Sequence, residues 1–249
     1  MFEHSWSRET EIYQTSMLRN ENILGYIASD IKGNGCSVNM LLITEYHPLG
    51  SLYDFLQSNF VEKSLLFRFL YSICNGLNHL HQEIISQAQH KPSIAHRDLK
   101  TKNILVKSNY ECCLADFGLA VRFNSGINQL DYGNSFPKAI STREGTVRYM
   151  PPECLNETIN VESFESFRRA DIYQLSLVIW ELLICCQTNK TNEDYENHRL
   201  PYSEFVNGDP DVSVMKDIVC SQRLRPTFKR EFEEEVSVKL IIFSLNKFN

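Results

Sequence analysis

Four polar side chains in the middle of the chain have the types and the spacing that phosphoryl transfer requires. Such a reaction needs a carboxylate to orient the attacking hydroxyl, a cation near the transferring group and oxygen ligands for magnesium. The sequences AHRDLKTKNILV and LADFGLA supply these groups as Asp98, Lys100, Asn103 and Asp116. A lone His-Arg-Asp or Asp-Phe-Gly triplet is a weak signal. Together, with Asn103 five residues and Asp116 eighteen residues after Asp98, they predict a catalytic loop and a metal-binding loop rather than two turns capped by aspartate.

The composition excludes several other classes of protein. The chain has 249 residues, 43% of them hydrophobic, with 25 Lys and Arg against 31 Asp and Glu and a net charge of −6. These values are typical of a globular protein and disfavour a disordered, collagenous or disulfide-scaffold chain. The acidic balance argues against a nucleic-acid partner. The eight cysteines form no C-x-x-C pair, so we expect neither a zinc site nor a disulfide ladder, but reduced thiols.

No segment of these residues is expected to cross a membrane. The most apolar stretch, IYQLSLVIWELLICC from Ile172, is interrupted by Gln174 and Glu181 and is too short for a bilayer. The chain alone would therefore be cytoplasmic.

Hydrophobic periodicity predicts the elements that must position the polar residues. Apolar residues recur at spacings of three and four from 64 to 85, which indicates a long helix with one buried face. A long aperiodic stretch from 124 to 143 is typical of a functional loop. The remaining predictions are helices over 4–18 and 169–186 and strands over 23–31, 40–46, 103–107 and 112–116.

With these motifs the sequence resembles the protein kinase family. The resemblance implies an α+β fold with two lobes, of which the N-lobe is incomplete and the C-lobe is mostly helical. It divides the chain into an N-lobe remnant of one helix and a strand hairpin (1–46), a hinge with the C-lobe (47–227) and a divergent tail (228–249).

The same resemblance implies roles for the polar residues. Asp98 becomes the catalytic base, Lys100 offsets charge on the transferring phosphoryl group, and Asn103 and Asp116 hold Mg²⁺ or Mn²⁺ beside ATP. His96 and Phe117 become packing residues, and Asp171 steadies the backbone of the catalytic loop.

Further ATP-site residues follow by resemblance alone. Glu9 would be the helix glutamate that pairs with a nucleotide-binding lysine, Thr44 the gatekeeper, and Glu45 to His47 the hinge that grips adenine. Ser51 and Leu105 would line the pocket. Glu9 could instead be a solvated helix charge, Ser51 a helix N-cap and Leu105 a core residue.

The resemblance can be narrowed to one group of receptors. SRETEIYQTSMLRNENILGYIASDIKGNG, LLITEYHPLGSLYDFL and KPSIAHRDLKTKNILVK look like type I receptors of the transforming growth factor β superfamily, and KGNG tilts this toward the bone morphogenetic protein branch. Lys100 and Thr146 are typical of serine/threonine kinases. This implies a single-pass membrane receptor, with a membrane helix absent from this chain, that acts with a type II receptor on Smad-type substrates in growth-factor signalling.

Two departures from the family leave an alternative open. The chain has no Gly-rich loop, and no strand lysine precedes Glu9, so we expect weak use of ATP. The residues after LRPTF also differ, which predicts that Glu153 of the A-P-E-like motif is a buried acid without its partner. The chain is therefore either an incomplete piece of a full receptor or a short product that acts as an inactive decoy or scaffold for Smad proteins or partner receptors. The serine-rich stretch also offers candidate phosphorylation sites at Ser125, Ser135, Ser141 and Thr142. A flexible serine-rich loop without phosphorylation is the commoner explanation.

Overall fold

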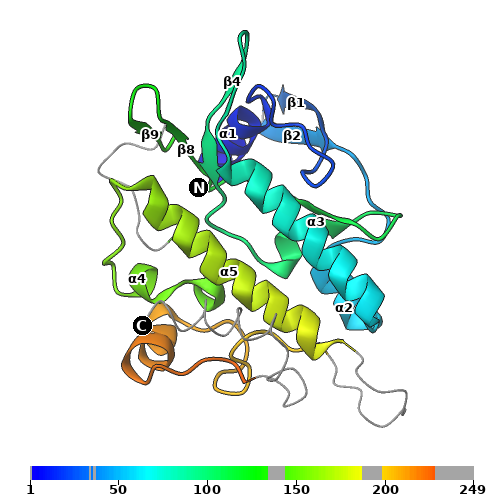
Figure 1. Cartoon of the computed structure of the whole chain (residues 1–249), viewed down its shortest axis with the longest axis vertical. Helices are drawn as coiled ribbons and strands as arrows, with labels where there is room; N and C mark the ends of the chain where they lie inside the picture. Colours follow the sequence, from blue (N-terminus) through cyan, green and yellow to red (C-terminus); the bar gives the residue numbers. More distant parts are fainter. Residues whose placement is uncertain (1, 34, 36–37, 134–143, 187–197, 228–249) are drawn as a thin grey trace.

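The computed structural model describes residues 2–33, 35, 38–133, 144–186 and 198–227. Its smaller part consists of α1 (Phe2–Tyr13) and a hairpin of β1 (Tyr26–Gly33) and β2 (Val38–Thr44). Its larger part is built on two long helices, α3 (Lys63–His81) and α5 (Phe164–Ile184), which cross the centre of the molecule in the same diagonal direction (Figure 1).

The small part is held together by α1. Strands β1 and β2 pair antiparallel, with Ile31 opposite Met40, and α1 packs on β2, where the Trp6 indole Nε1 donates to the carbonyl of Leu41 at 3.2 Å. Ile12 and Tyr13 at the end of α1 are buried in the core that continues into the larger part. The predicted helix over 4–18 is correct in type, but α1 begins at Phe2 and ends at Tyr13, and Met17 beyond it takes a left-handed φ of 59° that no α-helix contains.

Helix α3 has the apolar face that its periodicity predicts. Leu66, Ile73, Leu77 and Leu80 are all buried in the core. The helix ends at His81, where the buried Lys91 side chain donates from Nζ to the carbonyls of Leu80 and Gln82 at 3.0 and 2.7 Å. A cation at this position complements the negative end of the helix dipole.

Helix α5 is buried on nearly every side, which explains why its sequence shows no amphipathic stripe. Its polar residues Asp171, Gln174 and Glu181 are buried too, so each needs an internal partner. Among the described residues no helix combines the length and the hydropathy needed to span a bilayer.

Short antiparallel pairs connect the helices. They are β3 (Ile84–Ile85) with β4 (His90–Lys91), β6 (Ile104–Val106) with β7 (Cys112–Leu114), and the three-stranded sheet β5 (Ser93–Ala95), β8 (Val121–Asn124) and β9 (Gln129–Asp131). The prediction that 124–143 is wholly a loop is wrong for its first part, because β9 pairs with β8.

The remaining elements are short. They are α2 (Leu52–Ser58), η1 (Thr101–Asn103), η3 (Val147–Tyr149), α4 (Pro152–Leu155), α6 (Val212–Lys216) and η4 (Asp217–Ser221). No disulfide bond joins any of the seven cysteines that the structure describes. The tail 228–249 and the candidate sites Ser135, Ser141 and Thr142 lie outside the described residues.

Candidate active site

The loop that carries Asp98 is held in place by one buried aspartate of α5. The two carboxylate oxygens of Asp171 accept hydrogen bonds from the backbone N–H groups of His96 and Arg97, each at 2.8 Å. Arg97 adopts a left-handed φ of 70°, a conformation that is costly for a residue with a side chain. The contact predicted for Asp171 is present, and it explains how this strained turn persists.

The Asp98 carboxylate is surrounded by donors from three segments. Lys100 Nζ lies 2.7 Å from Oδ2, the Thr146 backbone N–H donates to Oδ1 at 2.8 Å, and the Asn103 side-chain amide donates to Oδ2 at 3.2 Å. Lys100 also donates to the Thr146 hydroxyl at 2.6 Å. Burial opposes ionisation of Asp98, but the Lys100 charge and the hydrogen bonds outweigh it and lower the pKa of the carboxyl. Asp98 is therefore a fixed carboxylate at neutral pH.

The two predicted metal ligands are brought to neighbouring positions by strand pairing. Ile104 of β6 pairs with Leu114 of β7, and the Ala115 N–H donates to the Asn103 carbonyl at 2.9 Å. Asp116 is the residue after Ala115, so it lies close to Asn103. Asp116 is exposed and takes a left-handed φ of 65°.

The donor chemistry of this pair fits Mg²⁺. Asn103 uses its amide nitrogen on Asp98, which leaves its amide oxygen as the atom with the chemistry of a hard-cation ligand. Magnesium is commonly held by one or two protein groups together with phosphate oxygens, so a small set is sufficient. No group of three or more His, Cys, Asp or Glu side chains gathers as a separate metal site in the described part of the chain.

A column of aromatic rings links α1 to the catalytic loop. The Phe117 ring lies 5.2 Å from both the Tyr13 ring and the His96 ring, and Tyr13 stacks on Tyr26 at 5.4 Å. Phe117 is fully buried, so the residue after Asp116 acts as an anchor for it. These contacts agree with the packing roles predicted for His96 and Phe117.

Glu9 points from α1 toward the Asp116 turn. Its Oε1 accepts from the Phe117 backbone N–H at 3.4 Å. Burial, followed by the negative charge of Asp116, raises the pKa of Glu9 to about 7. Glu9 is thus a half-buried acid that faces the site and not a solvated helix charge.

The predicted hinge residues follow directly from β2. The Thr44 hydroxyl donates to the Glu45 carbonyl at 3.3 Å, and the Glu45 N–H donates to the Gly25 carbonyl at 2.8 Å. The Glu45 carboxyl group lies close over Gly25, 2.3 Å from where a Cβ atom would stand, so a larger residue at 25 would only displace this exposed side chain. Burial lowers the pKa of His47.

Ser51 is the N-cap of α2. Its hydroxyl accepts from the Asp54 N–H at 3.1 Å in a reciprocal capping box, so the N-cap interpretation is confirmed. Its backbone bridges to Leu105, a half-buried residue packed against the core. Ser51 and Leu105 are therefore neighbours, as a shared pocket wall requires.

Sequence reasoning missed a second buried carboxylate near the site. The Glu181 side chain accepts from the Thr101 hydroxyl at 3.0 Å, the Tyr149 hydroxyl at 2.5 Å and His198 Nε2 at 2.7 Å. Gln174 likewise accepts from the Leu99 N–H at 2.9 Å. The sequence does carry a signal for both residues, since Gln174 and Glu181 interrupt an otherwise apolar helix. That signal served only as an argument against a membrane span.

Glu153 of the A-P-E-like motif is half-buried, and burial raises its pKa. The positive charges of Arg169 and Arg225 oppose that shift without cancelling it. That Glu153 lacks the partner it has in the family stays a prediction.

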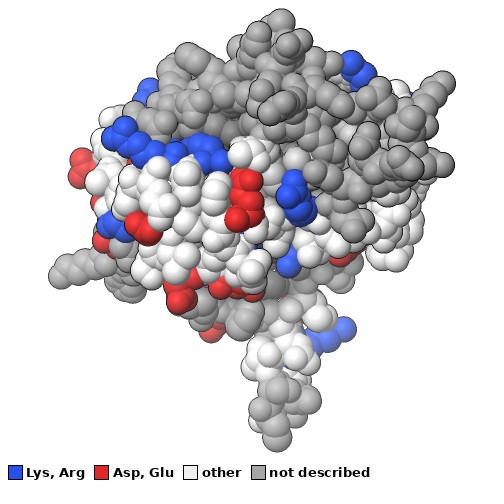
Figure 2. Space-filling model, turned by 90° about the horizontal axis from the view of Figure 1, so that it is seen from below, with Lys and Arg blue, Asp and Glu red and all other residues white. Residues whose placement is uncertain are grey.

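The face in Figure 2, seen from below the view of Figure 1, carries both signs of charge. Its lysine, arginine and acidic side chains lie in small groups separated by uncharged surface. The absence of a nucleic-acid partner remains a prediction.

Comparison with known proteins gives a consistent result. Residues 2–238 match the model of the protein kinase domain. The chain is 48% identical over 231 residues to the human TGF-beta receptor type-1, which covers 93% of this chain and 44% of the receptor. It is also 48% identical to the human activin receptor type-1C, over 93% of this chain and 45% of that receptor, and 49% identical to the mouse activin receptor type-1B, over 90% and 42%. The chain thus spans less than half the length of the curated relatives it matches.

Proposed function

Because the chain belongs to the protein kinase family and is homologous to receptor serine/threonine kinases, we propose that it is the kinase part of a type I growth-factor receptor. The reaction is ATP-dependent phosphorylation of serine or threonine on Smad-type proteins. The receptor would be a single-pass membrane protein that works with a type II receptor, with this part on the cytoplasmic side. The assignment of the receptor to the bone morphogenetic protein branch stays a prediction.

The observation that carries the proposal is the set of contacts around Asp98. A buried carboxylate with a lowered pKa, fixed by Lys100 and Thr146, has the state that a residue orienting a substrate hydroxyl needs. Lys100 contacts Asp98 and Thr146 at once, so the cation is tied to the segment beside the carboxylate.

Each residue then has a distinct task. Asp98 orients the substrate hydroxyl and accepts its proton, and Lys100 offsets negative charge on the group being transferred. Bound Mg-ATP supplies the phosphoryl group and the neutralising cation. Asn103 and Asp116 would hold the metal. The hinge from Glu45 to His47 would bind the adenine. The walls of the adenine pocket would be formed by Thr44, Ser51 and Leu105. Phe117 fixes the Asp116 turn through its buried ring.

A second candidate rests on a sequence observation. These 249 residues contain no Gly-rich loop and no strand lysine before Glu9. A cation about 4 Å from a phosphate charge is worth about 4 kcal/mol at an effective dielectric near 20. A kinase without that cation would use ATP poorly, and the second candidate is a decoy or scaffold that binds Smad proteins or partner receptors without transferring phosphate.

One experiment tests the role of Asp98. The purified chain, its Asp98→Asn variant and an Asp30→Asn control at an exposed site of β1 are incubated with Mg-ATP and a Smad tail peptide. Nucleotide binding is followed by thermal shift, and transfer by mass spectrometry. For a kinase, Asp98→Asn lowers transfer by about 10²-fold to 10⁴-fold while the nucleotide shift is unchanged. Equal transfer by Asp98→Asn and the parent chain would overturn the role of Asp98. Peptide binding without a nucleotide shift or transfer in any variant would show that these 249 residues do not act as a kinase by themselves, as the decoy or scaffold candidate requires.

A further inference from the structure

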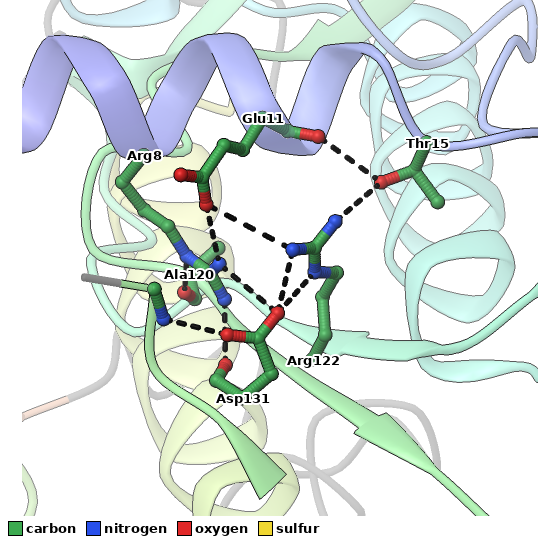
Figure 3. Close-up of polar contacts among 7 residues, drawn as sticks. Arg8, Glu11, Thr15, Ala120, Arg122 and Asp131 are labelled. Carbon is green, nitrogen blue, oxygen red and sulfur yellow. Dashed lines mark hydrogen bonds and ion pairs between the residues drawn. The ribbon is translucent and has the colours of Figure 1, made fainter.

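Charged side chains from distant parts of the sequence meet between α1 and the β8–β9 hairpin (Figure 3). Arg8 comes from α1, Arg122 from β8 and Asp131 from β9. Arg8 NH1 lies 3.3 Å from Asp131 Oδ2, Arg8 NH2 donates to the Asp131 carbonyl at 2.6 Å, and Arg122 Nε donates to Asp131 Oδ2 at 2.7 Å. Two arginines therefore converge on a single aspartate.

Asp131 is the centre of this cluster. Besides the two arginines, its Oδ1 accepts from the Gly133 backbone N–H at 2.7 Å. Burial works against its charge, but Arg8, Gly133 and Arg122 outweigh burial and lower the pKa of Asp131. Its side chain remains partly accessible, and it is ionised at neutral pH.

The charges in the cluster balance. Glu11 adds a second carboxylate, 3.1 Å from Arg8 NH1 and 3.8 Å from Arg122 NH2, so two cations face two anions. Arg8 is only 5% exposed. A guanidinium that has lost most of its water depends on its anionic partners, and the loss of one of them leaves a buried charge poorly compensated.

The cluster is joined to the site at two points of the chain. Arg8 precedes Glu9 on α1, and Arg8 Nε donates to the carbonyl of Ala120 at 2.7 Å, four residues after Asp116. Arg122 NH1 donates to the Thr15 hydroxyl just beyond α1 at 3.4 Å, which ties the hairpin to the other end of the helix. Movement of the hairpin would therefore displace the helix that carries Glu9.

We propose that Asp131 is a positioning residue, the centre of a clamp formed with Arg8, Arg122 and Glu11 that fixes α1 against the β8–β9 hairpin and thereby holds Glu9 at the Asp116 turn. The clamp itself stands on the contacts above, and only its importance for phosphoryl transfer rests on the proposed function. The central negative charge of the clamp is the carboxylate of Asp131. The clamp therefore forms without phosphorylation of the β8–β9 segment.

The position of Ser125 supports this last point. Its backbone N–H and hydroxyl both donate to the Glu83 carboxylate. A phosphate added to that hydroxyl would face a carboxylate instead of the two arginines, which Asp131 already occupies.

Hydrogen exchange of the whole chain tests the clamp without an activity assay. Asp131→Asn removes the charge and keeps the shape, Asp131→Glu keeps the charge, and Asp30→Asn changes an exposed carboxylate elsewhere. Asp131→Asn is expected to raise amide exchange at least about tenfold in residues 2–13 and 119–131. Asp131→Glu is expected to restore part of the protection, and Asp30→Asn to match the parent chain. Equal exchange in Asp131→Asn and the parent chain would overturn the proposal, as would a Glu variant no better than Asn.

A second readout follows the contact of Glu9. The Phe117 amide, which donates to Glu9 Oε1, is expected to exchange faster in Asp131→Asn, because α1 loosens and that contact opens. Unchanged Phe117 exchange in a folded Asp131→Asn chain would show that the clamp does not position Glu9.

The milder Arg122→Gln change keeps the test decisive if Asp131→Asn does not fold. The loss of Arg122 leaves the buried Arg8 with both of its anions, Glu11 and Asp131, so no buried charge loses its partner. Faster exchange in 119–131 is then the supporting result, and parent-like exchange the contrary one. Because neither readout uses ATP, a clamp can be confirmed in a chain that proves unable to transfer phosphate.

Discussion

Asp98 and Glu9 are two partly or fully buried carboxylates on opposite sides of the same site, and their pKa values move in opposite directions. In both cases burial is the largest influence and disfavours the charge. Around Asp98, Lys100 and Thr146 outweigh burial, whereas Glu9 lies beside a second acid, Asp116, which adds to it. A carboxylate that faces a cation and a backbone donor stays ionised and can accept a proton. A carboxylate that faces another carboxylate is protonated more easily.

The regions that carry these residues differ in the same way. The residues on both sides of Asp98 are tied to α5 by hydrogen bonds from the backbone N–H groups of His96, Arg97 and Leu99. The part around Glu9 exposes apolar side chains on its hairpin, such as Ile27 at 62%, and Tyr46 beyond it at 85%. The Asp98 loop is thus held by buried polar groups of α5, while α1 is held by the charged clamp and the segment between α1 and β1 by backbone hydrogen bonds such as Leu24 N–H to the Leu114 carbonyl at 2.9 Å.

The strongest way to break this contrast is to remove the anchor of the catalytic loop. Asp171→Ala leaves the N–H groups of His96 and Arg97 and the His81 ring without their acceptor. We expect a loss of about 3 to 5 kcal/mol in the free energy of unfolding, measured by urea denaturation. Asp171→Asn is the matched variant and should lose less, since one acceptor oxygen remains. Equal stability of Asp171→Ala and the parent chain would contradict the anchoring role.

The next effect comes from the unusual acidity of Glu9. Its pKa is about 7 in the folded chain against an ordinary value of 4.5, so the folded state binds more protons than the unfolded state between those pH values. Stability should therefore fall as the pH rises from 4.5 to 7. Glu9→Gln should flatten this slope and stabilise the chain at pH 8 by about 1 kcal/mol after solvent screening.

Thermal unfolding at several pH values measures both consequences. The amide of Glu9→Gln can still accept the Phe117 N–H, which isolates the charge. A parent chain whose stability does not change across this window would rule out the raised pKa.

A smaller effect is expected at Ser51. Ser51→Ala removes the acceptor for the Asp54 N–H and half of the capping box, so it should cost about 1 kcal/mol. Ser51→Asn, which can also cap, should recover most of the loss in a denaturation experiment. If alanine and asparagine are equally harmful, the serine acts through something other than capping.

The smallest effect on stability is expected for an exposed residue of the β1–β2 hairpin. Ile27 is mostly exposed on β1, so Ile27→Thr should change the unfolding free energy by no more than about 0.5 kcal/mol. Ile73→Thr, at a buried position of α3, is the matched comparison and should cost several times more. A large loss at Ile27 would show that this face is covered in solution.

The sequence was most informative where chemistry restricts residue types. Asp98, Asn103 and Asp116 could be predicted from spacing, and α3 from its apolar face. The β8–β9 hairpin was missed although its residues alternate between apolar and polar, because strands of four and three residues are too short for that alternation to stand out. Its pairing also depends on β5 and on the arginine cluster. Glu181 was missed because a buried polar residue in an apolar helix has no local signal that names its partners, which here lie up to 80 residues away.

The long reach of α5 has a consequence for the order in which the chain folds. The Asp171 carboxylate meets the His96 N–H across 75 residues, Gln174 meets Leu99 across 75, and Glu181 meets Thr101 across 80. Contacts of such sequence separation form late, because the entropy of closing the loop must be overcome first. At a synthesis rate of about 5 to 20 residues per second, the Asp98 loop waits about 4 to 15 seconds for its anchor to be made. During that interval the nascent chain carries the motif without its geometry.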